Sequence, residues 1–157
     1  MTDQLSVEDL AEIRQTLALY PHVFDNKDID GLSLVFTKDA TAEMTRGAGS
    51  IRRGLDAIAE FVVGLSEDAP DHLTLNTVVF VDDEGVVRAR SRYLAILADQ
   101  SMHDGDYFDV LVRTEDGWRI SYRISVPRFP RGEQVPPSQE AVDAWRRWVA
   151  GQQQGAE

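Results

Sequence analysis

The apolar residues of the first 65 positions recur at helical spacing in three stretches. The first begins at a capping signal, Ser6 with Asp9, and its apolar positions are Leu10, Ile13, Leu17 and Tyr20. Shorter stretches follow over residues 29–36 and 55–65. One-sided apolar spacing predicts amphipathic helices, so we expect three. Because Pro21 disfavours helix at the preceding residue, the first helix is expected to kink or change character before Asp25, and residues 25–28 to form a turn.

From residue 72 the pattern becomes typical of strands. Residues 72–81 and 86–98 flank one glycine-containing turn, and residues 107–114 and 118–126 flank another, which predicts two hairpins. Residues 39–44 predict a further strand. The chain then favours a C-terminal helix over about 138–150, with the apolar positions Ala141, Val142, Trp145, Trp148 and Val149. The elements together predict an α+β fold, a long curved antiparallel sheet packed on three N-terminal helices with an added C-terminal helix.

Length and composition narrow the class of protein. The 157 residues suit a single domain, 1–157, with a core over about 6–127 and a C-terminal extension. A net charge of -11 argues against nucleic acid, whose phosphates need a clustered cationic face. No stretch approaches the apolar length of a membrane span and no signal peptide is evident, so we expect a cytoplasmic protein that does not bind membranes.

Several kinds of chemistry are disfavoured by the residues available. The chain has no cysteine, which excludes disulfides and thiolate sites. Its three histidines are isolated and show no metal-ligand spacing, and no glycine-rich phosphate loop occurs, so we expect no metal and no cofactor. Arg88, Arg90 and Arg92 alternate on one strand face, which is typical of a solvated or salt-bridging face. Any chemistry must therefore come from His, Asp, Glu, Tyr, Arg or Ser side chains.

Local strings over roughly residues 6–127 resemble the SnoaL-like branch of the NTF2-like superfamily. They are Tyr20-x4-Asp25, the Asp-Ile-Asp-Gly-Leu run at residues 28–32, Lys-Asp-Ala at 38–40, Arg53-Gly54, His72-x3-Asn76 and the segment 113–120. The resemblance implies a cone-shaped α+β barrel around a deep, mostly apolar pocket. Members similar in these strings include scytalone dehydratase, bile-acid 7α-dehydratase, hexachlorocyclohexane dehydrochlorinase and polyketide cyclases. It also implies a homodimer.

The resemblance assigns roles to a few positions. Asp25 and His72 match the two places of the catalytic dyad in dehydratase-like members, and Tyr20 matches a tyrosine five residues before that aspartate. An arginine on or just after the last strand also recurs in the family, and both Arg123 and Arg128 compete for that position. The second pocket histidine of scytalone dehydratase has no clear counterpart, because a loop is expected around residue 103.

The residue chemistry supports a dyad independently. Alternation along residues 72–81 places His72, Thr74, Asn76, Val78 and Phe80 on one face, a mixed set as expected of a pocket. A histidine held by a carboxylate presents its other nitrogen as a base near neutral pH. In this interpretation His72 is the base, Asp25 orients it, and Tyr20 or Asn76 donates to a substrate oxygen. Such a site removes a proton next to a carbonyl group.

Each candidate also has a structural alternative. Asp25 is the residue type that caps turns, and Tyr20 shares its helical spacing with core residues. His72 would serve equally as a hydrogen-bonded residue at the start of a strand, Asn76 as a partner of backbone groups and His103 as a solvated loop residue. The leading hypothesis is a cofactor-independent lyase acting on a small, largely apolar carbonyl-containing substrate. The alternatives are an isomerase or polyketide-type cyclase with the same dyad, and a non-catalytic small-molecule-binding or assembly domain.

Overall fold

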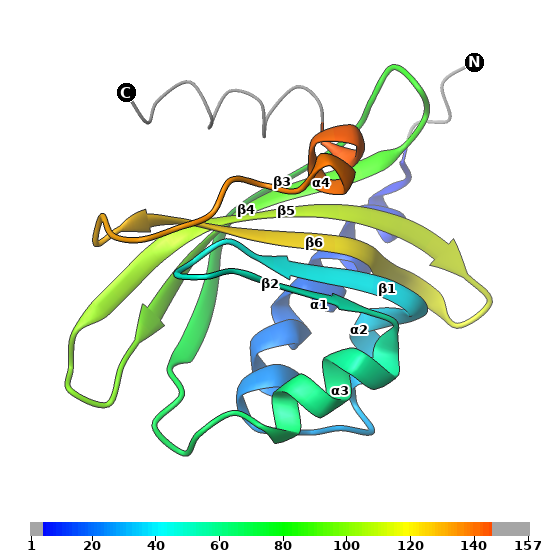
Figure 1. Ribbon diagram of the computed structural model, residues 1–157. Helices are drawn as coiled ribbons and strands as arrows, with labels where there is room; N and C mark the ends of the chain where they lie inside the picture. Colours follow the sequence, from blue (N-terminus) through cyan, green and yellow to red (C-terminus); the bar gives the residue numbers. More distant parts are fainter. Residues whose placement is uncertain (1–4, 146–157) are drawn as a thin grey trace.

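One curved, unclosed sheet of six strands runs through the described part of the chain, residues 5–145 of a computed structural model (Figure 1). The strands are β1 (Phe36–Met44), β2 (Ser50–Arg53), β3 (Asp71–Val81), β4 (Val87–Ile96), β5 (Met102–Thr114) and β6 (Gly117–Phe129). Their order in the sheet is β2-β1-β6-β5-β4-β3. Neighbours are antiparallel except β1 and β6, which run parallel. The prediction of an α+β fold with a curved sheet is confirmed, apart from this one parallel pair.

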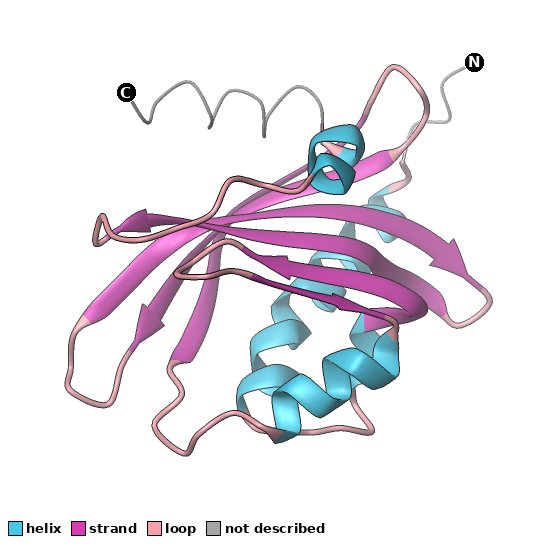
Figure 2. Ribbon diagram, viewed as in Figure 1, coloured by secondary structure: helices cyan, strands magenta, loops and turns pink. Residues whose placement is uncertain are grey.

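The helices lie on the two faces of the sheet. Beneath the concave face pack α1 (Val7–Asp25), α2 (Leu32–Val35) and α3 (Leu55–Val63), and α4 (Gln139–Ala144) lies on the opposite face (Figure 2). None of the helices within residues 5–145 has the length and apolar character needed to cross a membrane. The expected continuation of the C-terminal helix through Trp148 and Val149 lies outside the described residues. The three N-terminal helices therefore cover one face of the sheet, as their apolar spacing predicted.

Helix α1 carries two of the predicted site residues and begins at the capping box that the sequence indicates. The Ser6 hydroxyl accepts the Asp9 backbone N–H at 3.0 Å, and the Asp9 carboxylate accepts the Ser6 N–H at 3.1 Å. The helix continues through Pro21 to Asp25. Its buried residues include Ile13, Leu17 and Tyr20, so the apolar stripe faces the sheet and Asp25 lies at the C-terminal end.

The C-terminal segment is fastened to the convex face by a buried carboxylate. Glu43 is 3% exposed and accepts hydrogen bonds from the Tyr122 hydroxyl at 2.6 Å and from the Ser138 backbone N–H at 2.7 Å. Trp145 then packs edge-on against the rings of Phe80 and Phe108, with ring centroids 5.8 and 5.2 Å apart. These contacts hold α4 over the sheet without involving the concave face.

A bulge in β3 overturns the predicted assignment of its faces. Asn76 has φ 52°, and the pairing of β3 with β4 shifts register between Leu75 and Val78. Two residues there oppose one on β4, so the alternation inverts beyond the bulge. Val79 and Val81 therefore pack into the core on the concave face. Phe80 packs on the other face against the convex cluster, which consists of Phe108, Tyr122, Ile124, Val126, Ala141 and Trp145. The expected set His72, Thr74, Asn76, Val78 and Phe80 does not share one face, because strict alternation cannot count the extra residue.

Strand β5 also begins earlier than the pattern indicated. It starts at Met102, which brings His103 into the sheet instead of the expected loop. His72 pairs with Ala95 on β4, and Ala95 pairs with His103. Strands lie about 4.8 Å apart, so the two histidines occupy one row of the concave face roughly 10 Å apart. Desolvation and the Arg46 guanidinium lower the pKa of His103.

Candidate active site

The structure brings Asp25 and His72 together. Asp25 ends α1 and His72 is the second residue of β3, and the Asp25 Oδ1 atom lies 2.8 Å from His72 Nδ1. The other carboxylate oxygen, Oδ2, accepts the His72 backbone N–H at 2.6 Å. This two-point contact sets both the position and the orientation of the imidazole. No residue within 5–145 donates to or accepts from His72 Nε2.

The protonation of the ring follows from the partner. An ionised carboxylate only accepts hydrogen bonds, so a neutral His72 places its proton on Nδ1 and its lone pair on Nε2. The side chains are mostly covered, with 19% of His72 and 8% of Asp25 exposed. Such an imidazole is able to accept a proton from a bound molecule through Nε2, and Asp25 then stabilises the cation that forms.

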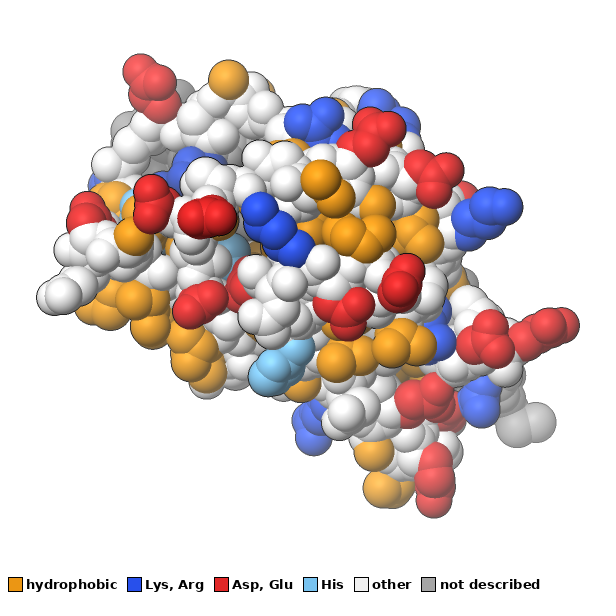
Figure 3. Space-filling view, turned by 90° about the horizontal axis from the view of Figure 1, so that it is seen from below, with side chains coloured by type: hydrophobic (Ala, Val, Ile, Leu, Met, Phe, Trp, Pro, Cys, Tyr) orange, Lys and Arg blue, Asp and Glu red, His pale blue; other side chains and the backbone are white. Residues whose placement is uncertain are grey.

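The dyad borders an open groove between α1 and the edge strand β3. The groove has a volume of about 480 Å³ and is lined by Ala18, Pro21, His22, Asp25, Asn26, Asp71, His72, Leu73, Thr74 and Leu75. Figure 3 shows the helical side of the molecule, on which histidine side chains reach the surface among apolar and acidic ones. The expected position at the base of a deep, closed apolar pocket is wrong, because the edge strand leaves this flank of the sheet uncovered.

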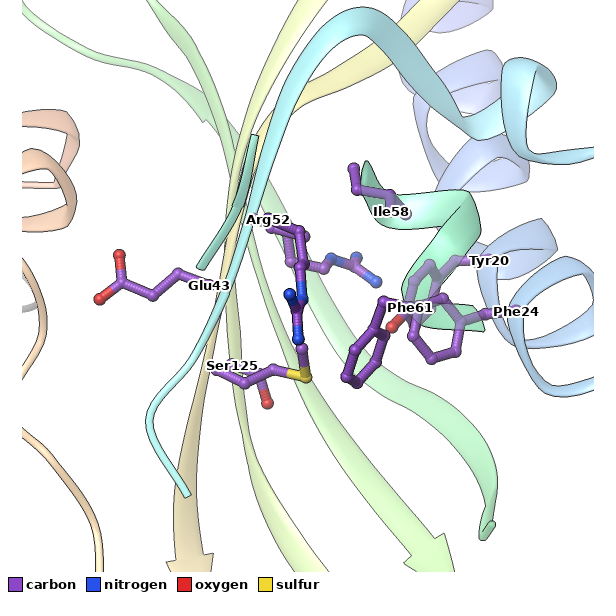
Figure 4. Close-up of a pocket in the computed structure, with 10 residues that line it drawn as sticks. Tyr20, Phe24, Glu43, Arg52, Ile58, Phe61 and Ser125 are labelled. Atoms are coloured by element: carbon purple, nitrogen blue, oxygen red, sulfur yellow. The ribbon is translucent and has the colours of Figure 1, made fainter. Parts of the chain in front are cut away.

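A second, more enclosed cavity lies inside the cone of the fold (Figure 4). Its volume of about 20 Å³ holds about one water molecule. It is lined by Tyr20, Phe24, Ala42, Glu43, Met44, Arg52, Ile58, Phe61, Arg123 and Ser125. The space is small because aromatic side chains of the protein fill most of the interior. Tyr20, the third predicted catalytic residue, therefore belongs to this cavity and does not line the groove of the dyad.

Arg123 is the only predicted arginine that points into this interior. Its side chain is 3% exposed, and its Nε atom donates to Asp109 Oδ1 at 2.7 Å and its Nη2 atom to Asp109 Oδ2 at 2.8 Å. The guanidinium lies between two rings, 4.1 Å from the centroids of Tyr20 and Tyr107. Its Nη1 atom is buried without a hydrogen-bond partner among residues 5–145. A free donor next to a cavity is available to a bound oxygen atom.

Burial and charge shift the titration of these interior groups in a consistent way. Burial raises the pKa of Tyr20 and of Tyr107 above their usual values, so both hydroxyls stay protonated at neutral pH. Burial is the largest single influence on the pKa of Arg123 and lowers it, but the charge and hydrogen bonds of Asp109, together with Tyr20 and Tyr107, raise it, and the net pKa lies above its usual range. The interior therefore offers donors, and the base lies on the other side of the tyrosine rings.

A wall of tyrosines separates the dyad from the enclosed cavity. The His72 ring is 6.1 Å from the Tyr93 ring, which stacks on Tyr107 at 4.8 Å, and Tyr107 lies 5.6 Å from Tyr20. Gly105 on β5 pairs with Tyr93 on the neighbouring strand β4, and its lack of a side chain leaves room for the Tyr93 ring. The sequence reasoning missed Tyr93 and Tyr107. Strand alternation was a usable signal for Tyr93, because Tyr93 lies two residues before Ala95, the partner of His72 on β4, and therefore faces the same side of the sheet.

Two other predicted binding residues lie elsewhere. Asn76 forms the exposed bulge of β3, and Arg128 lies on the convex face, where its Nη1 atom is 3.7 Å from Asp106 Oδ2. Neither lines the groove or the enclosed cavity.

Arg90 and Arg92 also approach Asp106, at 3.3 and 3.4 Å, so the alternating arginines form a salt-bridging face. Within residues 5–145, no group of three acidic or histidine side chains is arranged to hold a metal ion.

The chain is similar to several known proteins. A family model described as a SnoaL-like domain matches residues 5–124. An uncharacterized protein of Mycobacterium tuberculosis, Rv2910c, is 29% identical over 143 residues, which cover 83% of this chain and 93% of the relative. Among solved structures, an NTF2-like protein with a cystatin-like fold from Novosphingobium aromaticivorans has a TM-score of 0.68 and 21% identity, covering 80% and 86% of the two chains.

A second solved structure from Novosphingobium aromaticivorans, a candidate scytalone dehydratase, has a TM-score of 0.63 and 17% identity. The match covers 85% of this chain and 95% of that one. At this level of identity the likeness concerns the fold. The NTF2-like fold expected from the sequence is therefore confirmed.

Proposed function

Because this chain belongs to the SnoaL-like domain family, we propose that it is a cofactor-independent acid–base lyase that eliminates water from a small, largely apolar hydroxy-carbonyl compound. The observation that carries the proposal is the imidazole of His72, held at two points by Asp25 and free at Nε2. A base of defined tautomer at the edge of a substrate-sized groove supports proton abstraction next to a carbonyl.

The proposed reaction is an elimination. His72 Nε2 takes the proton from the carbon next to the carbonyl, and the electron pair of that C–H bond forms the new C=C bond. The C–O bond to the hydroxyl group breaks, and the leaving oxygen takes the proton that His72 Nε2 removed from carbon and departs as water, which returns His72 to its neutral form. Asp25 stabilises the charged imidazole. The donation predicted for Tyr20 is not part of this step, because Tyr93 and Tyr107 lie between Tyr20 and the groove of the dyad.

The first step is tested directly with the β-hydroxy ketone 3-hydroxy-1-phenylbutan-1-one. Proton abstraction is followed by NMR as exchange of the proton next to the carbonyl in D₂O, and elimination as the absorbance of the conjugated enone. Removal of the base in His72→Asn is expected to lower both rates about 100-fold or more. His22→Asn is a matched control, because His22 lines the same groove and forms no hydrogen bond with Asp25 within residues 5–145. Equal rates in wild type and His72→Asn contradict the proposed role of His72.

Isomerisation and cyclisation share this first step, so exchange without enone formation supports an isomerase or cyclase in place of the lyase. A non-catalytic binding domain is a second candidate, and the openness of the groove favours it. The dyad lies in hydrogen-bond contact, as expected of an enzyme, but 19% of the His72 side chain is exposed. Binding of the hydroxy ketone without exchange supports this second candidate and contradicts catalysis.

We further propose a homodimer, on the resemblance to the family alone. Light scattering after size-exclusion chromatography is expected to give twice the mass of the chain. The mass of a single chain contradicts this expectation.

A further inference from the structure

Two arginines line the enclosed cavity. Arg123 on β6 is buried, and its Nη1 atom has no hydrogen-bond partner within residues 5–145. Arg52 on β2 is exposed, and its guanidinium lies 5.1 Å from the centre of the Phe61 ring. In Figure 4 the Arg52 side chain lies beside Phe61, on the side of the cavity that Tyr20 and Phe24 also border. The cavity thus has one buried and one exposed guanidinium.

The charges around the cavity are not balanced. Asp109 neutralises Arg123 through two hydrogen bonds. Glu43 belongs to the lining, but its carboxylate is taken by Tyr122 and Ser138 and points away from the aromatic side chains (Figure 4). Arg52 has no acidic partner within the described residues. A cation left unpaired beside a cavity, in a chain of net charge -11, indicates an anionic ligand.

The aromatic residues of the cavity lining indicate which chemical group carries the anion. Tyr20 and Phe24 have ring centroids 5.0 Å apart, and Phe24 and Phe61 6.1 Å apart, so the three rings form a row. Arg123 lies against the Tyr20 end of this row and Arg52 against the Phe61 end. A row of rings between two guanidiniums suits a flat apolar group that carries an oxyanion.

We propose that this cavity binds the carboxylate of a ring-bearing monocarboxylic acid. One carboxylate oxygen takes the water-sized space and accepts from Arg123 Nη1, and the second faces Arg52, whose exposed side chain is able to move as the ligand enters. The ring of the ligand packs against the half-buried Phe61 beside Arg52, because the enclosed space holds only one oxygen atom and Tyr20 and Phe24 are buried. This inference goes beyond the proposed function, because Tyr93 and Tyr107 separate this cavity from the groove of the dyad.

Binding is measured without turnover, by titrating the ¹⁵N-labelled protein with cinnamate and with its uncharged isostere cinnamide. We expect cinnamate to bind about tenfold more tightly, the size of one charge-assisted hydrogen bond. The chemical shift changes are expected to centre on Arg52, Phe61, Phe24 and Tyr20. In Arg52→Gln the preference for cinnamate is expected to fall to about twofold.

Arg53→Gln is the matched control. Arg53 is the next residue on β2, and it faces Glu140 at 3.0 Å on the other side of the sheet. This variant is expected to keep the full preference. Equal affinities for the two probes, an unchanged preference in Arg52→Gln, or no binding of cinnamate at millimolar concentration overturns the inference. Because the assay needs no reaction, carboxylate binding without proton exchange contradicts only the enzymatic proposal, and exchange on neutral ketones without carboxylate preference contradicts only this one.

Discussion

Gly105→Ala tests whether the tyrosine wall beside the dyad requires a residue without a side chain at position 105. Gly105 lies opposite Tyr93 on β4, and a Cβ atom built at Gly105 would lie 2.5 Å from Tyr93 Cζ and would also collide with the Val126 carbonyl oxygen. The ring is able to move, but the carbonyl belongs to the backbone of β6, so the sheet itself must shift. Alanine is therefore expected to be overpacked at this position.

The magnitude follows from these two collisions. Overpacking a filled interior costs about 1–3 kcal/mol. The lower chain entropy of unfolded alanine offsets about 0.4–1 kcal/mol of this cost. Because a backbone atom is one of the obstacles, we expect a net loss of roughly 2 kcal/mol. For a chain of this length the midpoint of thermal unfolding then falls by roughly 4–8 °C.

The assay is equilibrium unfolding in urea, followed by circular dichroism and by tryptophan fluorescence, to which the buried Trp118 contributes. Gly132→Ala is the control, because nothing lies within 4 Å of a Cβ atom at Gly132. Gly132→Ala is expected to leave the free energy of unfolding nearly unchanged. If Gly105→Ala also stays within about 0.5 kcal/mol of wild type, Tyr93 does not lie over Gly105, and the description of the wall is wrong.

Three further predictions concern stability. Glu43→Gln removes a buried acceptor of the Ser138 hydrogen bonds, so we expect a loss of about 1–3 kcal/mol in urea unfolding and faster hydrogen exchange over residues 138–145; unchanged exchange contradicts this. Trp145→Ala empties the convex cluster and is expected to cost about 3 kcal/mol by the same assay, whereas a change below about 0.5 kcal/mol shows that α4 is not docked. Hydrogen bonds from Trp118 and Ser6 lower the pKa of Asp9 below 3.8, so its stabilising effect is present above pH 3.8 and is lost as the pH falls through the lowered pKa. The difference in melting temperature between wild type and Asp9→Asn should therefore shrink in acid, and a difference independent of pH contradicts the assignment.

Local patterns in the sequence determined the elements and two of the site residues. The capping box at Ser6, the apolar stripe of α1 and the glycine-containing turns are properties of neighbouring residues, and each predicted its element. The contact of Asp25 with His72 was also predictable, although 47 residues separate them, because the family strings carry both positions. Their role in catalysis remains a prediction.

Only the tertiary structure decided which side chains face the interior. The bulge at Asn76 inverts one strand, and no periodicity reveals an extra residue that pairing with β4 selects. Arg123 and Arg128 compete in the sequence, and the packing of β6 turns Arg123 inward and Arg128 outward. The rings of Tyr20, Tyr93 and Tyr107 come into contact only when α1, β4 and β5 are assembled. Together they fill most of the interior, so a small enclosed cavity remains in place of a deep pocket. Spacing along a chain reports the faces of an element, whereas cavities depend on contacts between residues far apart in sequence.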